Sequence, residues 1–265
     1  VQQDCARALA NLASNEDTHT TIYRQSAMHA LFDLADSPVD VTQRYAAMGL
    51  RFLATDPDIR ALTIRDNMLK VYLKLAVSPL LEYRRVAAAS FGSFSLHEAN
   101  RGPMVRQDVL PCLMSLLAED DLQIKRDAAF AAANFADSLE LQNDMIREGA
   151  IPTLSKAGKH DDIRVQRDVA RAFAFLTEPS DLKQVAVEQG ALPTLLALVK
   201  SLDITCQRYA TLALCNVCIG DYKIFIVEQG ALKALTFLAR FPDMDIQRCT
   251  SLAVAGLALG QPENK

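Results

Sequence analysis

The 265-residue chain contains no tryptophan, only 10 glycines and 10 prolines, and 6% aromatic residues. So few turn-forming residues argue against a strand-rich fold, because hairpins and sandwiches need many tight turns. No apolar run approaches the roughly 18 to 20 residues that a membrane-spanning helix requires. The formal net charge of -4 gives no global basic footprint, so nucleic acid is not an expected partner.

Sites for chemistry are also missing from the sequence. The six cysteines lack a disulfide-framework spacing, and we interpret them as reduced core residues of an intracellular protein. Cys215 and Cys218 form a C-x-x-C pair, but no second pair or nearby histidine completes a zinc site. We interpret the four histidines as surface or loop residues. Phosphate-loop, dinucleotide-binding, zinc-protease and nucleophile-elbow motifs do not occur. We therefore expect no enzyme activity, catalytic residue, metal or cofactor.

What the chain does contain is an internal repeat. Seven segments superimpose without gaps on one pattern of small and apolar positions, and each ends a helix near residue 13, 54, 95, 136, 177, 218 or 258. One alignment column, here called the asparagine column, steps by 41 residues five times and then by 40. Its members are Asn11, Phe52, Ser93, Asn134, Phe175, Asn216 and Gly256. A fixed period of this length is typical of stacked helical repeats.

A second column with the same period holds residues that tolerate a left-handed backbone or cap helices. Its members are Ser26, Asn67, Asp108, Gly149, Gly190 and Gly230. Around it, each period contains a short first helix, a turn, a second helix, a loop rich in Asp, Pro or Ser, and a longer third helix. Because no single period can bury its apolar faces alone, we predict one all-α solenoid domain over 1–265, with about six to seven three-helix repeats.

The motifs at Glu188–Leu195 and Gln207–Asn216 resemble the armadillo repeat, and the resemblance extends over nearly the whole chain. The HEAT repeat, of similar length, is the alternative. The resemblance implies a right-handed superhelix whose third helices line a concave groove. It also implies that asparagines of the third helices bond the backbone of an extended peptide, and Asn11, Asn134 and Asn216 match that position. Nuclear-import adaptors of this family also have a tryptophan four residues before the asparagine. Because this chain has no tryptophan, we do not expect it to bind nuclear localisation signals in that way.

An arginine column lies eight residues before the asparagine column, at Arg44, Arg85, Arg126, Arg167, Arg208 and Arg248. A positive charge near a helix N-terminus interacts unfavourably with the helix dipole. Because the arginine recurs at this position, we expect a nearby anion to compensate for its charge. One interpretation is pairing with loop carboxylates, such as Asp40, Asp121, Asp162, Asp203 or Asp245. The other is a basic rail for an acidic or backbone-rich ligand. Phe175 is either a core residue or an apolar pocket of the groove. The candidate partner-binding groove therefore consists of Arg44, Arg85, Arg126, Arg167, Arg171, Arg208, Asn134, Phe175 and Asn216.

These features predict a cytoplasmic, non-enzymatic scaffold that holds an extended or acidic protein segment in its groove. The layout is similar to that of short armadillo-repeats-only organelle adaptors of apicomplexan parasites and of the yeast vacuole. That similarity implies an acylated N-terminal segment, absent from this sequence, that tethers the protein to the cytosolic face of an organelle membrane. The alternatives are a repeat segment of a larger cytoskeletal or ciliary protein and RNA binding along the arginine column. The sequence leaves the oligomeric state open.

Overall fold

The computed structural model describes residues 1–66, 68–219 and 222–258, and these residues form only helices, turns and loops. The predicted all-α fold class is confirmed. In the described ranges, no helix is both long enough and apolar enough to span a bilayer.

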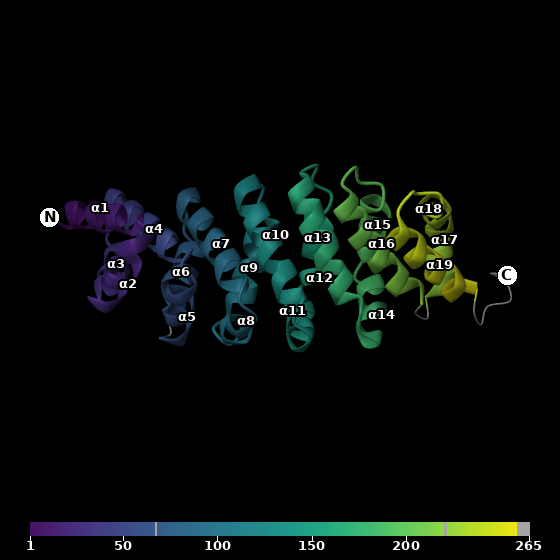
Figure 1. Cartoon of the computed structure of the whole chain (residues 1–265), viewed down its shortest axis with the longest axis horizontal. Helices are drawn as coiled ribbons and strands as arrows, with labels where there is room; N and C mark the ends of the chain where they lie inside the picture. Colours follow the sequence, from purple (N-terminus) through teal and green to yellow (C-terminus); the bar gives the residue numbers. More distant parts are fainter. Residues whose placement is uncertain (67, 220–221, 259–265) are drawn as a thin grey trace. The chain divides into compact units, whose positions relative to one another are not determined.

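The helices follow one another as triplets (Figure 1). The first helices are α2 (His19–Arg24), α5 (Pro57–Arg65), α8 (Glu98–Val105), α11 (Gln142–Arg147), α14 (Ser180–Glu188) and α17 (Lys223–Glu228). The second helices are α3 (Ala27–Ala35), α6 (Leu69–Ala76), α9 (Val109–Ala118), α12 (Ala150–Ala157), α15 (Ala191–Leu198) and α18 (Ala231–Leu238). The third helices are α1 (Gln2–Ala13), α4 (Asp40–Leu53), α7 (Leu81–Ser95), α10 (Leu122–Ala136), α13 (Ile163–Leu176), α16 (Ile204–Cys218) and α19 (Met244–Ala258). Short 3₁₀ helices at Glu16–Thr18 and Leu139–Leu141 precede α2 and α11.

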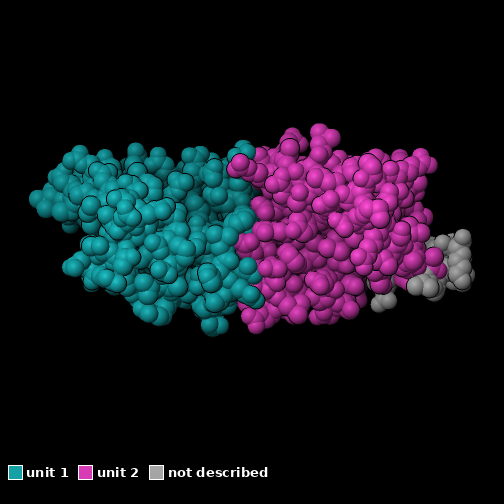
Figure 2. Space-filling model, viewed as in Figure 1, with its two compact units in different colours: residues 1–131 teal, residues 132–265 magenta. Residues whose placement is uncertain are grey.

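The chain forms two compact units, residues 1–131 (unit 1) and residues 132–265 (unit 2), coloured separately in Figure 2. In unit 1, α4 contacts α1 and α7, α5 contacts α2 and α8, and α6 contacts α9. In unit 2, α16 contacts α13 and α19, and α12 contacts α15. Helices of the same kind therefore pack on one another within each unit, as stacked repeats do. A single domain over 1–265 stays a prediction.

A residue in the left-handed conformation joins the first and second helices of a repeat. The backbone angle φ is positive at Ser26, Asp108, Gly149, Gly190 and Gly230, which confirms the second column. Asn67 lies outside the described residues. Glycine adopts this conformation without strain, whereas serine or aspartate there costs roughly 1–2 kcal/mol, so the two non-glycine turns are the less favourable ones.

Aromatic side chains join successive repeats in the core of unit 1. Tyr72 and Phe94 are fully buried, with ring centroids 5.0 Å apart and planes nearly perpendicular. The Tyr72 hydroxyl donates to the carbonyl of Leu50 at 3.1 Å. The phenol therefore satisfies its polar atom while its ring fills the space between α4, α6 and α7.

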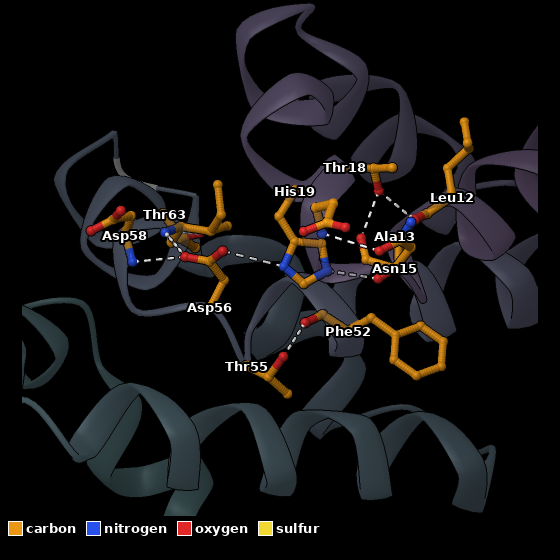
Figure 3. A network of polar contacts seen from close by, with 12 residues as sticks. Leu12, Ala13, Asn15, Thr18, His19, Phe52, Thr55, Asp56, Asp58 and Thr63 are labelled. Carbon is orange, nitrogen blue, oxygen red and sulfur yellow. Dashed lines mark hydrogen bonds and ion pairs between the residues drawn. The ribbon is translucent and has the colours of Figure 1, made fainter.

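A buried polar side chain at or near the start of several first helices caps the preceding third helix. His19 is 1% exposed, and its Nε2 lies 2.7 Å from the carbonyl oxygen of Ala13 (Figure 3). Its Nδ1 lies 3.3 Å from Oδ2 of Asp56, whose Oδ1 caps α5 through the backbone N–H groups of Asp58 and Ile59. The interpretation of all four histidines as surface or loop residues is therefore wrong for His19, because third-helix carbonyls need donors when the chain buries them.

The same cap recurs at equivalent positions in later repeats. Arg101 Nε donates to the carbonyl of Ser95, and Gln142 Nε2 to that of Ala136, both at 2.8 Å. Both side chains are more than nine-tenths buried. Histidine, arginine and glutamine thus make the same kind of hydrogen bond at equivalent positions. A search for identical residues does not detect this pattern.

Candidate functional site

The arginine column makes contact with carboxylates of the following repeat. Nη2 lies 2.6–2.7 Å from Oδ2 in three pairs, Arg85 with Asp121, Arg167 with Asp203, and Arg208 with Asp243. In the first two pairs Nε also donates to Oδ1, at 3.2 and 3.1 Å, which gives the planar two-bond geometry of strong arginine–carboxylate pairs. We call these three pairs the arginine–aspartate links.

Each linking aspartate also caps the third helix that follows it. Its Oδ1 accepts the backbone N–H of the residue three positions on, at 3.0 Å for Ile124, 2.8 Å for Cys206 and 3.1 Å for Ile246. The arginine hydrogen bond is the main reason that the pKa of all three carboxyls falls below its usual value. One carboxylate therefore serves a helix N-terminus of its own repeat and an arginine of the preceding one.

Arg44 is paired differently, because Leu80 stands where the linking aspartate would be. Its Nε lies 3.0 Å from Glu82, and its Nη2 has a longer contact of 3.6 Å with Asp40. Arg126 occupies the corresponding place on α10 and is half-buried.

The contacts match the first interpretation, pairing within the fold, at Arg44, Arg85, Arg167 and Arg208. The side chains of these four arginines keep 43–51% of their surface exposed. An external ligand for them stays a prediction.

In unit 2, polar groups of the asparagine column join neighbouring third helices. Arg171 Nη2 donates to Oδ1 of Asn134 at 3.0 Å and lies 3.3 Å from Asp168. Burial raises the pKa of Asp168, and the positive charge of Arg171 partly offsets that effect. The structure thus brings two predicted site residues, Asn134 and Arg171, into direct contact, and the Asn134 oxygen is used inside the fold.

Asn216 makes a similar connection one repeat later. Its Nδ2 donates to the carbonyl of Ala174 and to the hydroxyl of Thr177, both at 3.3 Å. Its Oδ1 accepts no hydrogen bond within the described part of the chain, so that oxygen can accept a peptide N–H. Phe175 is half-buried on α13, and Asn11 is exposed on α1.

A hollow in unit 1 lies between the third helices α4, α7 and α10. It measures about 210 Å³, with small side chains of Ala89, Gly92 and Ser93 in its wall and Phe130 beside them. Arg51 and Asp127 also line it and bring a donor and an acceptor to the same opening.

Burial raises the pKa of Asp127, while a 2.9 Å hydrogen bond from Gln123 and the charge of Arg51 act against that rise. Arg51 is exposed and makes no side-chain hydrogen bond or ion pair with the residues that the structure describes. Sequence reasoning missed both residues. The Arg-Asp pair at 126–127, which recurs at 167–168, could have drawn attention to Asp127, but no sequence signal indicated Arg51.

The thiols show no sign of a reactive centre. Cys206, Cys215 and Cys218 are buried as interpreted, but Cys5 is exposed. Burial raises the pKa of Cys215 to about 11 and that of Cys218 to about 12, which disfavours the thiolate. Within the described ranges, no group of three or more His, Cys, Asp or Glu side chains could hold a metal ion.

Comparison with known proteins agrees with this architecture. Residues 179–219 match the family model of the armadillo/beta-catenin-like repeat. An engineered protein from a structural-genomics programme is 26% identical over 99% of this chain, with a TM-score of 0.83, and the match spans 66% of its own length. A computationally designed armadillo repeat protein for modular peptide recognition is 22% identical over 85% of this chain and 98% of its own, with a TM-score of 0.78. Another, solved in complex with the peptide (KR)4, is 21% identical over 86% and 98%, with a TM-score of 0.74. No curated protein matches the sequence.

Residues 179–219 thus carry an armadillo/beta-catenin-like repeat, and the chain shares the stacked-helix fold of designed armadillo repeat proteins.

Proposed function

We propose that the surface formed by the third helices, here called the third-helix face, binds an extended segment of a partner protein without catalysing a reaction. In this proposal the backbone of the segment contacts Arg51 and Asp127 at the hollow in unit 1. The observation that carries this proposal is that Arg51 and Asp127 line the same hollow, whose wall is otherwise made largely of small residues. A peptide group offers one acceptor and one donor, which the guanidinium and the carboxylate complement. Small residues in the wall let a second backbone approach closely.

The similar designed proteins support a peptide as the ligand. One is described as made for modular peptide recognition, and another was solved with a peptide of alternating lysine and arginine. In the present chain, Arg85, Arg167 and Arg208 already contact aspartates, so an acidic ligand would compete with those contacts. Recognition of peptide groups through Arg51 and Asp127 of unit 1, or through Asn216 of unit 2, requires no such competition.

Gly92→Ala provides the test, because it narrows the hollow without disturbing the fold. A Cβ at Gly92 would lie 3.5 Å from the Asp127 carbonyl oxygen and 3.5 Å from Phe130 Cδ1, which is ordinary contact. Alanine inside a helix is also favoured over glycine by roughly 0.5–1 kcal/mol, so this variant should be the more stable one.

Peptides are first selected on the wild-type chain from a random-sequence display library, and their affinities are then measured by fluorescence anisotropy. We expect Gly92→Ala and Arg51→Ala each to weaken binding by about tenfold, which corresponds to about 1.4 kcal/mol. Ser115→Ala, an exposed helix-favouring change on α9, is the control and should bind as the wild type does. Unchanged affinity in both test variants would refute the proposal.

A further inference from the structure

A second surface of unit 2 is formed by the second helices α15 and α18 and the residues just after them, and no described third-helix residue lines its hollows. Two adjoining hollows of about 550 and 560 Å³ share Lys233 and Phe237 in their walls. These volumes fall within the range of about 300–1,000 Å³ that ligand pockets occupy. We define the basic–aromatic surface as Lys200, Lys233, Phe237, Arg240 and Phe241.

The apolar part of this surface consists of Phe237 and Phe241. Phe237 is 50% exposed, and its ring centroid lies 6.4 Å from that of Phe241. Counting from the left-handed glycine, the position of Phe237 holds Ala197 and Lys156 in the two preceding repeats. Repeats of this protein thus form without an aromatic residue there. Phe237 and Phe241 are neighbours and line adjoining hollows, and a contiguous apolar patch of this kind, unlike a single exposed residue, marks an interaction site.

The charged part has one sign only. Lys200, Lys233 and Arg240 are all exposed, and no carboxylate lines either hollow among the described residues. None of the three cations makes a side-chain hydrogen bond or ion pair with the described part of the chain. This is the opposite of the arginine column, whose cations meet aspartates inside the fold.

We propose that the basic–aromatic surface docks an acidic segment of a partner protein that carries at least one large apolar residue. The apolar side chain enters the hollow against Phe237, and flanking Asp or Glu side chains meet Lys200, Lys233 and Arg240. A hot spot of this kind combines a desolvated aromatic anchor with charged groups at its rim. This surface is independent of the third-helix face, so one scaffold holds two different segments.

The test is a differential peptide selection. A random-sequence display library is selected on the wild-type chain and counter-selected on the variant F237A/K233E/R240E, and the two pools are sequenced. We expect the wild-type-specific peptides to combine Leu, Phe or Tyr with Asp or Glu. Enrichment of basic peptides, or no difference between the pools, would overturn the proposal.

Affinities of the enriched peptides then separate the two parts of the surface. Phe237→Ala alone and Lys233→Glu with Arg240→Glu should each weaken binding by about tenfold. Lys156→Glu with Lys159→Glu makes the same charge change in an earlier repeat of unit 2 and should leave binding within about twofold. Equal loss in that control would show unspecific charge attraction and contradict the proposal.

Folding and membrane binding are checked on the same variants. Circular dichroism and thermal unfolding should be unchanged by Phe237→Ala, because the side chain is half exposed. Binding to membranes is measured by co-sedimentation with phosphatidylcholine vesicles that contain phosphatidylserine. Vesicle binding that depends on Phe237, without selective peptide binding, would assign the surface to lipid and overturn the proposal.

Discussion

His19 has a hydrogen-bond acceptor at each ring nitrogen, the carbonyl of Ala13 at one and the carboxylate of Asp56 at the other. The doubly protonated ring satisfies both with donors, while the neutral ring satisfies one. The side chain is 1% exposed, so water cannot replace a missing donor. Its contribution is therefore the satisfaction of a buried helix end, and Gln142 makes the same contribution in a later repeat.

His19→Ala should lower the free energy of unfolding by about 1–3 kcal/mol, because the Ala13 carbonyl loses its buried donor. His19→Gln should recover much of that loss, since glutamine fills the equivalent position at Gln142. Urea unfolding followed by circular dichroism measures both. Equal destabilisation by the two variants would show that the Asp56 contact, and not the cap, carries the effect.

Thiol accessibility gives a second prediction for single residues. Cys206, Cys215 and Cys218 are buried, and burial raises their pKa values, to about 11 for Cys206. Their thiolate fraction at pH 8 is therefore smaller than that of an exposed thiol. With N-ethylmaleimide and mass spectrometry, we expect Cys5 to react first and these three only on unfolding. Early modification of Cys218 in the native chain would contradict the buried α16.

Between elements, the arginine–aspartate link is the contact that recurs. The aspartate is the N-terminal cap of one third helix and the acceptor of an arginine from the previous one. Loss of the carboxylate therefore affects two helices at once. Because the arginine side chains are 43–50% exposed in these links, solvent screening keeps the charge part of each link small.

Asp203→Asn and Asp203→Ala separate the two roles. Asparagine caps a helix as well as aspartate does, so it should cost only the charge interaction, about 1 kcal/mol or less. Alanine also removes the cap and should cost about 1 kcal/mol more. Chemical unfolding at pH 7 tests this order.

The cost of Asp203→Asn should also depend on pH. The folded state lowers the pKa of Asp203, so its stabilisation is fully present above the unfolded value of about 4 and is lost as pH falls through the lower folded value. The difference between wild type and Asp203→Asn should therefore shrink in acid. A difference that stayed constant from pH 7 to acid would mean that the charge contributes nothing.

The period, the helix triplets and the left-handed turns could be predicted from sequence because each depends on local residue types. Gly149, Gly190 and Gly230 indicate their own backbone conformation. Partners across repeats were harder to predict. The sequence interpretation included Asp245 and not Asp243 among the loop carboxylates, but Asp243 is the one closer to Arg208, at 2.7 Å against 3.8 Å. The last period is 40 residues and not 41, which moves the capping aspartate one position earlier.

The hollow at Arg51 and Asp127 was beyond sequence reasoning for a different reason. Its lining comes from three helices that are separated by whole repeats, and no column aligns Arg51 with Asp127. Only packing brings them to one opening. The asparagine column could be predicted from the repeat pattern. The hydrogen bond between Asn134 and Arg171 could not, because it depends on how neighbouring third helices pack.

At the scale of the molecule, stability is distributed over neighbouring repeats. Within each unit, third helices such as α4 and α16 contact the third helices of the adjacent repeats, so a local change should spread mainly to nearest neighbours. Such proteins open in parts, and each part has its own free energy.

Hydrogen exchange can follow this behaviour. Asp203→Ala should speed amide exchange in α13 and α16, whose ends meet at the link, and leave α4 and α7 at wild-type rates. Arg85→Ala should give the reverse pattern, with faster exchange in α7. Mass spectrometry of exchanged peptides measures both. A uniform increase throughout the chain in either variant would indicate all-or-none unfolding.

The arginine–aspartate link has a modular consequence. In each link, the arginine of one repeat contacts the aspartate of the following repeat. One copy of the sequence between these two residues therefore contains both partners of the link. Duplicating residues 163–203 in tandem would provide each new aspartate with its arginine, whereas a copy of the Leu80 junction would carry Glu82 as its substitute. We therefore expect added repeats to be tolerated better at an arginine–aspartate link than at the Leu80 junction.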